Sequence, residues 1–165
     1  MAVRFTVGPV RLAYELKGAV EPVLAVTPGW VSHLTFDWEW PEIRAYYQRL
    51  AAGRTLLRWD KRGTGLSDRP HGAESYALET RVRDMEAVLD ASGVRRVALF
   101  GWSDGGLMAL AFAARHPERV SHLILYGAYA RLAWAPDYPH GLDDRQREAL
   151  VTLVSAEWGL GSRLL

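Results

Sequence analysis

Short apolar runs alternate with longer amphipathic segments along most of the chain. Runs of this length, rich in β-branched residues and bounded by Gly or Pro, are typical of β-strands. Six runs are interpreted as strands: residues 3–7, 11–17, 23–27, 55–59, 97–100 and 120–126. The turn at Gly8 and Pro9 separates the first two runs and predicts an antiparallel pair.

The segments between these runs have the period of α-helices. Apolar residues recur three or four positions apart, which places them on one face of a helix. The predicted helices run from Pro41 to Gly53, from Leu78 to Gly93, over 105–115 and over 143–158. Strands that alternate with helices predict an α/β fold with a mostly parallel sheet and helices on both faces.

The last 39 residues, 127–165, follow a different pattern. Residues 127–141 contain Pro136, Pro139 and several aromatic residues, without a regular period. The helix over 143–158 begins with Asp143 and Gln146 in the spacing of a capping box, and Gly159 is expected to end it. We therefore expect residues 1–126 to form the N-terminal part of the core and residues 127–165 to begin a lid or cap.

Composition excludes several classes of function. Apolar residues make up 49% and charged residues 24%, the balance of a globular domain, and a net charge of +1 gives no basic excess for nucleic acid or a membrane surface. The chain has no cysteine, which excludes disulfides and thiolate metal sites, and it has no metal-binding histidine spacing. We expect a cytoplasmic protein with no metal, no cofactor, and neither a nucleic-acid nor a membrane partner.

A Gly-x-Ser-x-Gly pattern lies between the fifth strand and the following helix. Its residues are Gly101, Trp102, Ser103, Asp104 and Gly105, and Gly106 follows directly. In a sharp turn from strand to helix, Gly101, Gly105 and Gly106 leave room for close packing, and the serine is forced to a positive φ. Ser103 is thus the candidate nucleophile. An ordinary glycine-rich turn is the alternative.

Two loops flank this candidate. Pro28, Gly29 and Trp30 follow the third strand, where the backbone N–H of Trp30 could form an oxyanion hole with that of Asp104. An ordinary turn is again the alternative for Trp30. The loop 60–68 lacks the third glycine of a dinucleotide fingerprint, and 101–106 lacks the lysine of a P-loop. We interpret 60–68 as a structural loop beside the active site, and all five histidines as structural or solvated.

These motifs, in this order, resemble the α/β-hydrolase superfamily from Val3 to about Tyr129. Segments 27–33, 60–68 and 125–131 are similar to one subgroup, the hydrolase-like domains attached to adenylate/guanylate cyclase or transcription-regulator domains. The resemblance implies strand order 1-2-4-3-5-6, Ser103 as nucleophile, and Trp30 and Asp104 as oxyanion donors. A serine at this position disfavours the members with an Asp nucleophile, such as haloalkane dehalogenases and epoxide hydrolases.

The resemblance also implies that the fold is incomplete. In this fold the catalytic acid and histidine follow the serine on later strands, and no segment after residue 126 resembles a strand. We expect an N-terminal portion of about six strands, cut within the lid, with the C-terminal strands missing and the acid and histidine beyond residue 165. Asp137 is the nearest carboxylate to the sixth strand, and His140 is the histidine that follows it.

Two functions remain open. The first is a serine hydrolase that cleaves a carboxylic-ester or related acyl bond of a small molecule through an acyl-enzyme on Ser103. The second is a non-catalytic, ligand-sensing module or an inactive fragment. A missing seventh strand would also leave strand 120–126 with an unpaired apolar edge, so we expect self-association through it.

Overall fold

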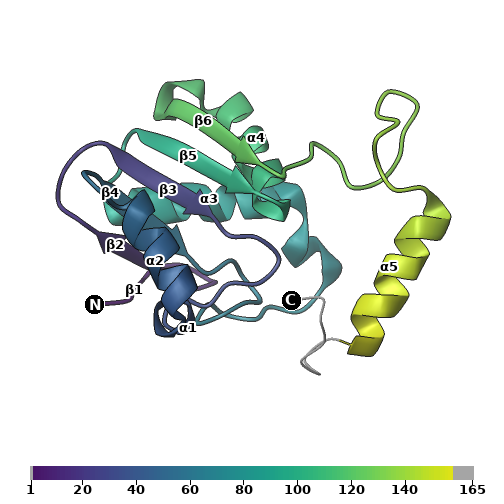
Figure 1. Ribbon diagram of the computed structural model, residues 1–165, viewed down its shortest axis with the longest axis horizontal. Helices are drawn as coiled ribbons and strands as arrows, with labels where there is room; N and C mark the ends of the chain where they lie inside the picture. Colours follow the sequence, from purple (N-terminus) through teal and green to yellow (C-terminus); the bar gives the residue numbers. More distant parts are fainter. Residues whose placement is uncertain (1, 158–165) are drawn as a thin grey trace. The chain divides into compact units, whose positions relative to one another are not determined.

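The computed structural model describes residues 2–157, with six strands in one sheet (Figure 1). The strands are β1 (Arg4–Phe5), β2 (Ala13–Lys17), β3 (Val23–Thr27), β4 (Thr55–Trp59), β5 (Val97–Trp102) and β6 (Val120–Tyr126). Their order is β1-β2-β4-β3-β5-β6. β2 runs antiparallel to both of its neighbours, β1 and β4, whereas β4, β3, β5 and β6 are parallel to one another. The predicted α/β class and strand order are confirmed.

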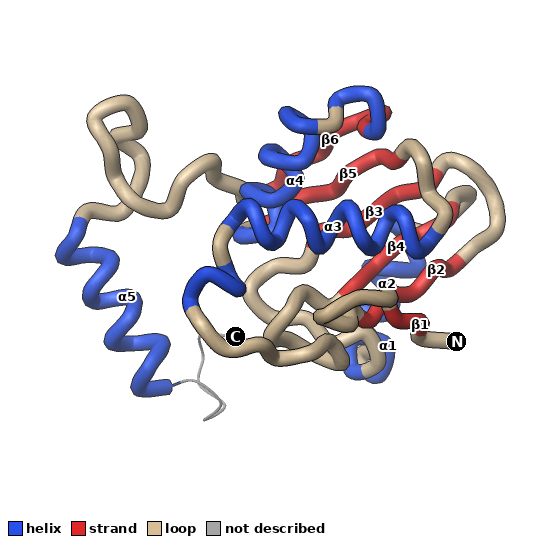
Figure 2. Tube along the Cα trace, turned by 180° about the vertical axis from the view of Figure 1, so that it is seen from behind, coloured by secondary structure: helices blue, strands red, loops and turns tan. Residues whose placement is uncertain are grey.

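Helices cover both faces of the sheet (Figures 1 and 2). One face carries α1 (Phe36–Glu39) and α2 (Pro41–Leu50), and the other carries α3 (Leu78–Ser92) and α4 (Asp104–Arg115). Short 3₁₀ helices, η1 (Ala73–Tyr76) and η2 (Pro117–Arg119), precede α3 and β6.

The core follows from the alternation of side chains along each strand. In β3, Val23 and Ala25 pack with the buried residues of α3 and α4, whereas Leu24 and Val26 pack against Tyr47 of α2. All five residues of β3 are buried, as expected for a central strand covered on both faces.

Several boundaries differ from the predicted ones. The first strand shrinks from 3–7 to Arg4–Phe5, and the helix after Pro41 ends at Leu50. β5 runs two residues past Phe100, because Gly101 and Trp102 continue the pairing with β6. The short helix α1 is an addition to the predicted elements.

The chain divides into two compact units, residues 1–129 and a unit that begins at Ala130. The second unit contains α5 (Asp144–Glu157), whose first turn is capped as predicted. The backbone N–H of Gln146 donates to Asp143 Oδ1 at 2.8 Å, and Asp143 N–H donates to Gln146 Oε1 at 3.0 Å. The predicted helix end at 158–159 lies outside the described residues. Between residues 2 and 157, the helices are all too short or too polar to span a bilayer.

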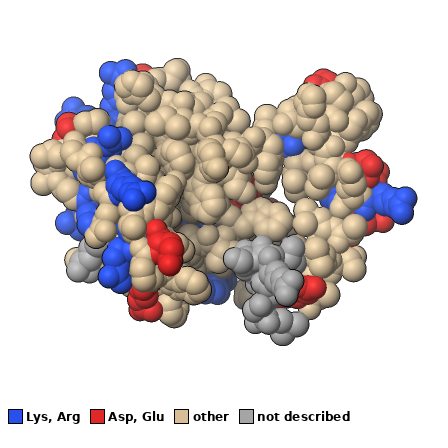
Figure 3. All heavy atoms as spheres, in the orientation of Figure 1, with Lys and Arg blue, Asp and Glu red and all other residues tan. Residues whose placement is uncertain are grey.

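β6 forms the outer edge of the sheet in the described chain. Within residues 2–157 it pairs with β5 alone, and Leu123, Ile124 and Leu125 are 37%, 45% and 42% exposed. Figure 3 shows mainly uncharged side chains over β5 and β6. An exposed apolar edge of this kind offers unpaired backbone groups to another chain.

We propose that the 165-residue chain self-associates through residues 120–126. In size-exclusion chromatography with light scattering, the mass should rise above 18.5 kDa with concentration. Ile124→Lys should suppress this rise, because a charged edge resists strand pairing. Val151→Lys, at an exposed position of α5, is the matched control. A mass of 18.5 kDa at every concentration would contradict the proposal.

Candidate active site

Ser103 occupies the turn between β5 and α4. Its φ is 51° and its ψ is −133°, and it is the non-glycine residue with positive φ in the described chain. Its N–H donates to the Tyr126 carbonyl at 3.1 Å, and its carbonyl accepts from Gly106 N–H at 3.0 Å. A non-glycine residue in this backbone conformation is strained by about 1–3 kcal/mol, and the surrounding structure holds it there. The glycine pattern predicts this turn.

The glycines around Ser103 lie where the backbone segments nearly touch. A Cβ atom on Gly101 would stand 2.8 Å from Gly106 Cα, and one on Gly105 would stand 2.6 Å from the Thr27 carbonyl oxygen and 2.8 Å from that of Pro28. The start of α4 thus packs directly on the loop that follows β3. This close packing brings the loop after β3, which carries Trp30, against the turn that carries Ser103.

We expect Gly105→Ala to destabilise the protein by about 1–3 kcal/mol, because its methyl group overlaps backbone oxygens that cannot move away. Chemical denaturation gives the free energy of unfolding. Ala114→Ser is the control, since it adds one heavy atom at an exposed position of the same helix. Equal stability of the Gly105 variant and wild type would show that the loop yields.

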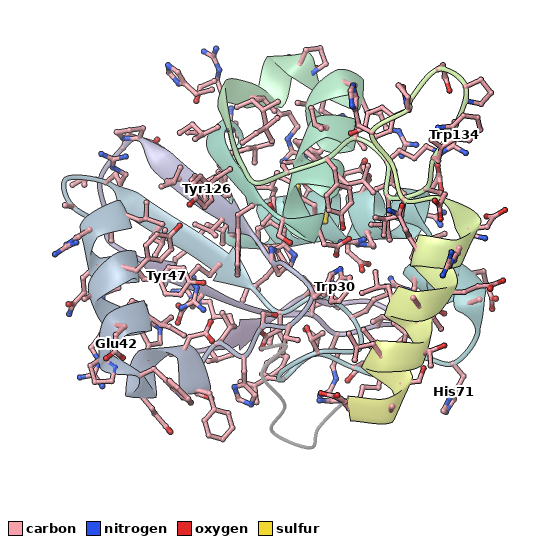
Figure 4. The ribbon with its side chains drawn as sticks, turned by 45° about the vertical axis from the view of Figure 1, so that its right-hand side comes forward. Trp30, Glu42, Tyr47, His71, Tyr126 and Trp134 are labelled. Carbon is pink, nitrogen blue, oxygen red and sulfur yellow. The ribbon has the colours of Figure 1, made fainter. Side chains whose placement is uncertain are left out.

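The two candidate oxyanion donors lie at the carboxyl ends of β3 and β5. Trp30 is 37% exposed on the loop after β3 (Figure 4), and Asp104 is the first residue of α4. The side-chain hydroxyl of Thr27 donates to the Gly105 carbonyl at 2.9 Å and so ties this loop to α4. Among the described residues, neither Trp30 N–H nor Asp104 N–H donates a hydrogen bond. Both donors therefore remain available to an acceptor.

The side chain of Asp104 has partners that the sequence did not reveal. Lys61 Nζ donates to its Oδ2 at 3.0 Å, and Arg81 donates to Oδ2 at 2.6 Å and to Oδ1 at 3.2 Å. Burial alone would raise the pKa of Asp104, but the hydrogen bonds and charges of Arg81 and Lys61 outweigh it and lower the pKa. From the sequence, Asp104 was expected to act through its backbone N–H only.

Tyr129 completes the surroundings of Asp104 at the end of the first unit. Burial raises the pKa of the Tyr129 hydroxyl, and the neighbouring charge of Asp104 raises it further. The phenol therefore stays protonated at neutral pH and remains a hydrogen-bond donor.

The loop 60–68 is held by a buried carboxylate. Asp60 is fully buried, and its Oδ2 accepts the N–H groups of Leu34 at 3.3 Å and Leu66 at 2.9 Å. Ser67 Oγ donates to the Asp60 carbonyl at 2.6 Å. These contacts are those of a structural loop. Lys61, the residue after Asp60, nevertheless binds Asp104 at the candidate active site.

No described histidine of the first unit forms a hydrogen bond with Ser103, and two of them bind other side chains. His33 Nδ1 lies 3.0 Å from Thr35 Oγ1, and His116 Nε2 lies 2.7 Å from Glu86 Oε1. Within the described part of this unit, no histidine forms a hydrogen bond with Ser103. In residues 2–157 no group of three or more His, Asp or Glu side chains is placed to hold a metal ion.

A cavity of about 430 Å³ opens beside the turn, between α2 and the ends of β5 and β6. Its lining is mainly aromatic and aliphatic: Val31, Asp37, Glu42, Ile43, Tyr46, Tyr47, Trp102 and Tyr126. Figure 4 shows Glu42 and Tyr47 on α2 and Tyr126 at the end of β6. Trp102 precedes Ser103, so the cavity reaches the chain next to the candidate nucleophile.

Comparison with known proteins agrees with the α/β fold described above. The family model described as the alpha/beta hydrolase fold matches residues 23–155. The chain is 40% identical over 89 residues to a 2-hydroxy-6-oxo-2,4-heptadienoate hydrolase of Pseudomonas putida, covering 54% of this chain and 32% of that protein. It is 30% identical over 130 residues to the human serine hydrolase BPHL, covering 77% of this chain and 43% of that protein.

The solved structure of an esterase from Exiguobacterium antarcticum superimposes with a TM-score of 0.76 at 27% identity. The match covers 93% of this chain and 56% of the esterase. The chain thus spans about half the length, or less, of the relatives that it matches.

Proposed function

The chain belongs to the α/β-hydrolase fold family, and we propose that the protein is a serine hydrolase that cleaves a carboxylic-ester or related acyl bond. The observation that carries the proposal is the backbone of Ser103. Its φ is positive in the turn between β5 and α4, and at the same end of the sheet the N–H groups of Trp30 and Asp104 have no partners in the described chain. A plain helix start needs no such strain.

The reaction proceeds through an acyl-enzyme. Ser103 Oγ attacks the carbonyl carbon of the ester while its proton passes to a general base, and the N–H groups of Trp30 and Asp104 hold the oxyanion. The leaving alcohol departs with that proton. Water then attacks the acyl-enzyme by the same route and releases the acid.

We propose that the general base comes from sequence that this chain does not include. Two observations support this: the relatives are about twice as long, and the described histidines of the first unit do not bond Ser103. Without a base in contact, a serine hydroxyl is a weak nucleophile at neutral pH.

The cavity beside Ser103 suggests the kind of substrate. Its volume of about 430 Å³ suits a small molecule, and its aromatic walls suit an apolar acyl or leaving group. The named relatives include an esterase and the serine hydrolase BPHL, which supports an acyl substrate.

A second candidate function is a non-catalytic one. The hydrolase-like fold would sense a ligand for an attached domain, such as an adenylate/guanylate cyclase or a transcription regulator. The lack of a histidine bonded to Ser103 in the described first unit favours this alternative for the chain by itself.

Trapping of the acyl-enzyme tests the proposed function. The full-length protein, mixed with p-nitrophenyl acetate and quenched in acid, should carry an acetyl group that mass spectrometry maps to Ser103. Ser92, whose hydroxyl donates to the Leu89 carbonyl on α3, serves as the unmodified reference. Turnover with acylation elsewhere, or binding without turnover, would favour the sensing module.

The 165-residue chain gives a second test. Because no described histidine of its first unit forms a hydrogen bond with Ser103, we expect it to hydrolyse a p-nitrophenyl ester no faster than its Ser103→Ala variant. Initial rates over background measure this. Strong turnover that depends on Ser103 would show that the chain holds its own base, with His140 the first residue to replace.

A further inference from the structure

Three separate elements meet at the carboxylate of Asp104. Lys61 comes from the loop after β4, Arg81 from the first turns of α3, and Asp104 begins α4. Their side chains are only 12–15% exposed. Arg81 binds both carboxylate oxygens, the two-pronged geometry that makes such pairs short and directional.

This anchored side chain belongs to the residue that offers a proposed oxyanion donor. Asp104 directly follows Ser103, and its N–H lies at the positive end of the α4 dipole. A donor stabilises the oxyanion only if it is fixed where the charge develops. The bonds to Lys61 and Arg81 fix the side chain of Asp104 and hence the start of α4.

The cluster also holds more positive than negative charge. Lys61 and Arg81 supply two cations against the one carboxylate of Asp104. The buried Nε of Arg81 has no partner in the described residues. Inside a protein, where the effective dielectric is below that of water, an excess positive charge favours a nearby oxyanion.

We propose that Arg81 and Lys61 are positioning residues for the oxyanion hole, acting through the carboxylate of Asp104. This inference rests on the proposed hydrolase function. The two residues hold the Asp104 N–H in place and add a positive charge beside the developing oxyanion. They are distinct from the nucleophile and touch no substrate atom.

A second ion pair provides a matched control. Arg62 donates to both carboxylate oxygens of Asp84, from Nε at 2.6 Å and from Nη2. This pair also joins the loop after β4 to α3, and its side chains are 12% and 8% exposed. It does not involve α4. Loss of Arg62 therefore removes a similarly buried, two-pronged ion pair without loosening Asp104.

The experiment compares Arg81→Met with Arg62→Met in the full-length protein. Both variants should lose free energy of unfolding, and Arg62→Met should lose at least as much as Arg81→Met, because Asp104 keeps Lys61 as a partner. Only Arg81→Met should lower kcat for p-nitrophenyl acetate, by about 10- to 100-fold with little change in KM, because the donor is misplaced in the transition state. Arg81→Lys, which keeps the charge, should recover part of kcat.

The possible results separate the positioning role of Arg81 from the role of Ser103 as nucleophile. Equal kcat values for Arg81→Met and Arg62→Met, or an effect on KM alone, would overturn the positioning role while leaving Ser103 as nucleophile. If Ser103→Ala retains full turnover, the hydrolase proposal fails, and the positioning role fails with it. If Arg81→Met does not fold, Arg81→Lys is compared with Arg62→Lys instead. A lower kcat with unchanged KM in Arg81→Lys alone would support the positioning role, and equal kcat values would overturn it.

Discussion

Replacement of Ser103 by alanine is expected to reduce ester hydrolysis by the full-length protein on the order of 10⁴- to 10⁶-fold in kcat. The variant lacks the oxygen that forms the acyl-enzyme, and only the oxyanion donors and substrate binding remain. The fold should persist, since Ser103 donates and accepts through its backbone to Tyr126 and Gly106. Steady-state rates with p-nitrophenyl acetate, and circular dichroism for the fold, measure the two effects.

Ser92→Ala is the matched control, because it removes a hydroxyl from α3 that bonds only its own helix in the described chain. Its kcat should equal that of wild type. A Ser103→Ala variant that keeps more than a tenth of the wild-type rate would rule out Ser103 as the nucleophile. Hydrolysis would then have to proceed through another nucleophile or through direct attack by water.

Arg58→Met is expected to cost about 3–5 kcal/mol of unfolding free energy at neutral pH. Arg58 is buried on the α2 face of the sheet, where it donates to Glu15 Oε1 at 3.2 Å and to Asp37. Its guanidinium carbon lies 3.6 Å from the ring centre of Tyr47. Removing the cation leaves two buried carboxylates without the guanidinium that binds both of them. Chemical denaturation at pH 7.5 measures the loss.

The loss of unfolding free energy in Arg58→Met should be smaller at acid pH. Burial already raises the pKa of Glu15 and Asp37 above their ordinary values, in spite of Arg58. Without Arg58 these pKa values rise further, so the folded state keeps protons that the unfolded chain has released. A group of this kind loses stability as pH rises from its unfolded pKa through its folded pKa. The Arg58 variant should therefore regain stability as the pH falls toward the ordinary pKa of these carboxyl groups, about 4.

Arg11→Met provides the control for this prediction. Arg11 pairs with Asp68 at 3.3 Å, but their side chains are 65% and 37% exposed. Exposed pairs contribute at most about 1 kcal/mol, so this variant should stay within that range of wild type. Equal losses for Arg58→Met and Arg11→Met would mean that water reaches the buried carboxylates.

The buried partners around Arg58 also bear on α1, which sequence analysis did not predict. Trp38 of this short helix donates its indole N–H to Glu15 at 2.9 Å, and Asp37 binds Arg58. The helix has no buried residue and no side-chain cap. A four-residue helix has too few internal hydrogen bonds to form by itself. Its contacts with β2 and β4 account for its place in the fold.

The sequence by itself determined the features that depend on neighbours along the chain. The alternation of apolar runs and amphipathic segments gave the strand and helix order, because each pattern can bury only one kind of surface. The strained turn at Ser103 was predictable for the same reason: its five residues, 101–105, are contiguous, and Gly101 and Gly105 permit what a Cβ would block.

The tertiary structure alone decided which distant side chains meet. Asp104 lies 43 residues from Lys61 and 23 from Arg81, and Arg58 lies 43 from Glu15 and 21 from Asp37. The strand order β2-β4-β3-β5 brings the partners of Asp104 together at the carboxyl ends of the parallel strands. It brings the partners of Arg58 together on the face of the sheet that α2 covers. No local pattern encodes such pairs, because a buried charge is stable only beside a partner that the fold itself supplies.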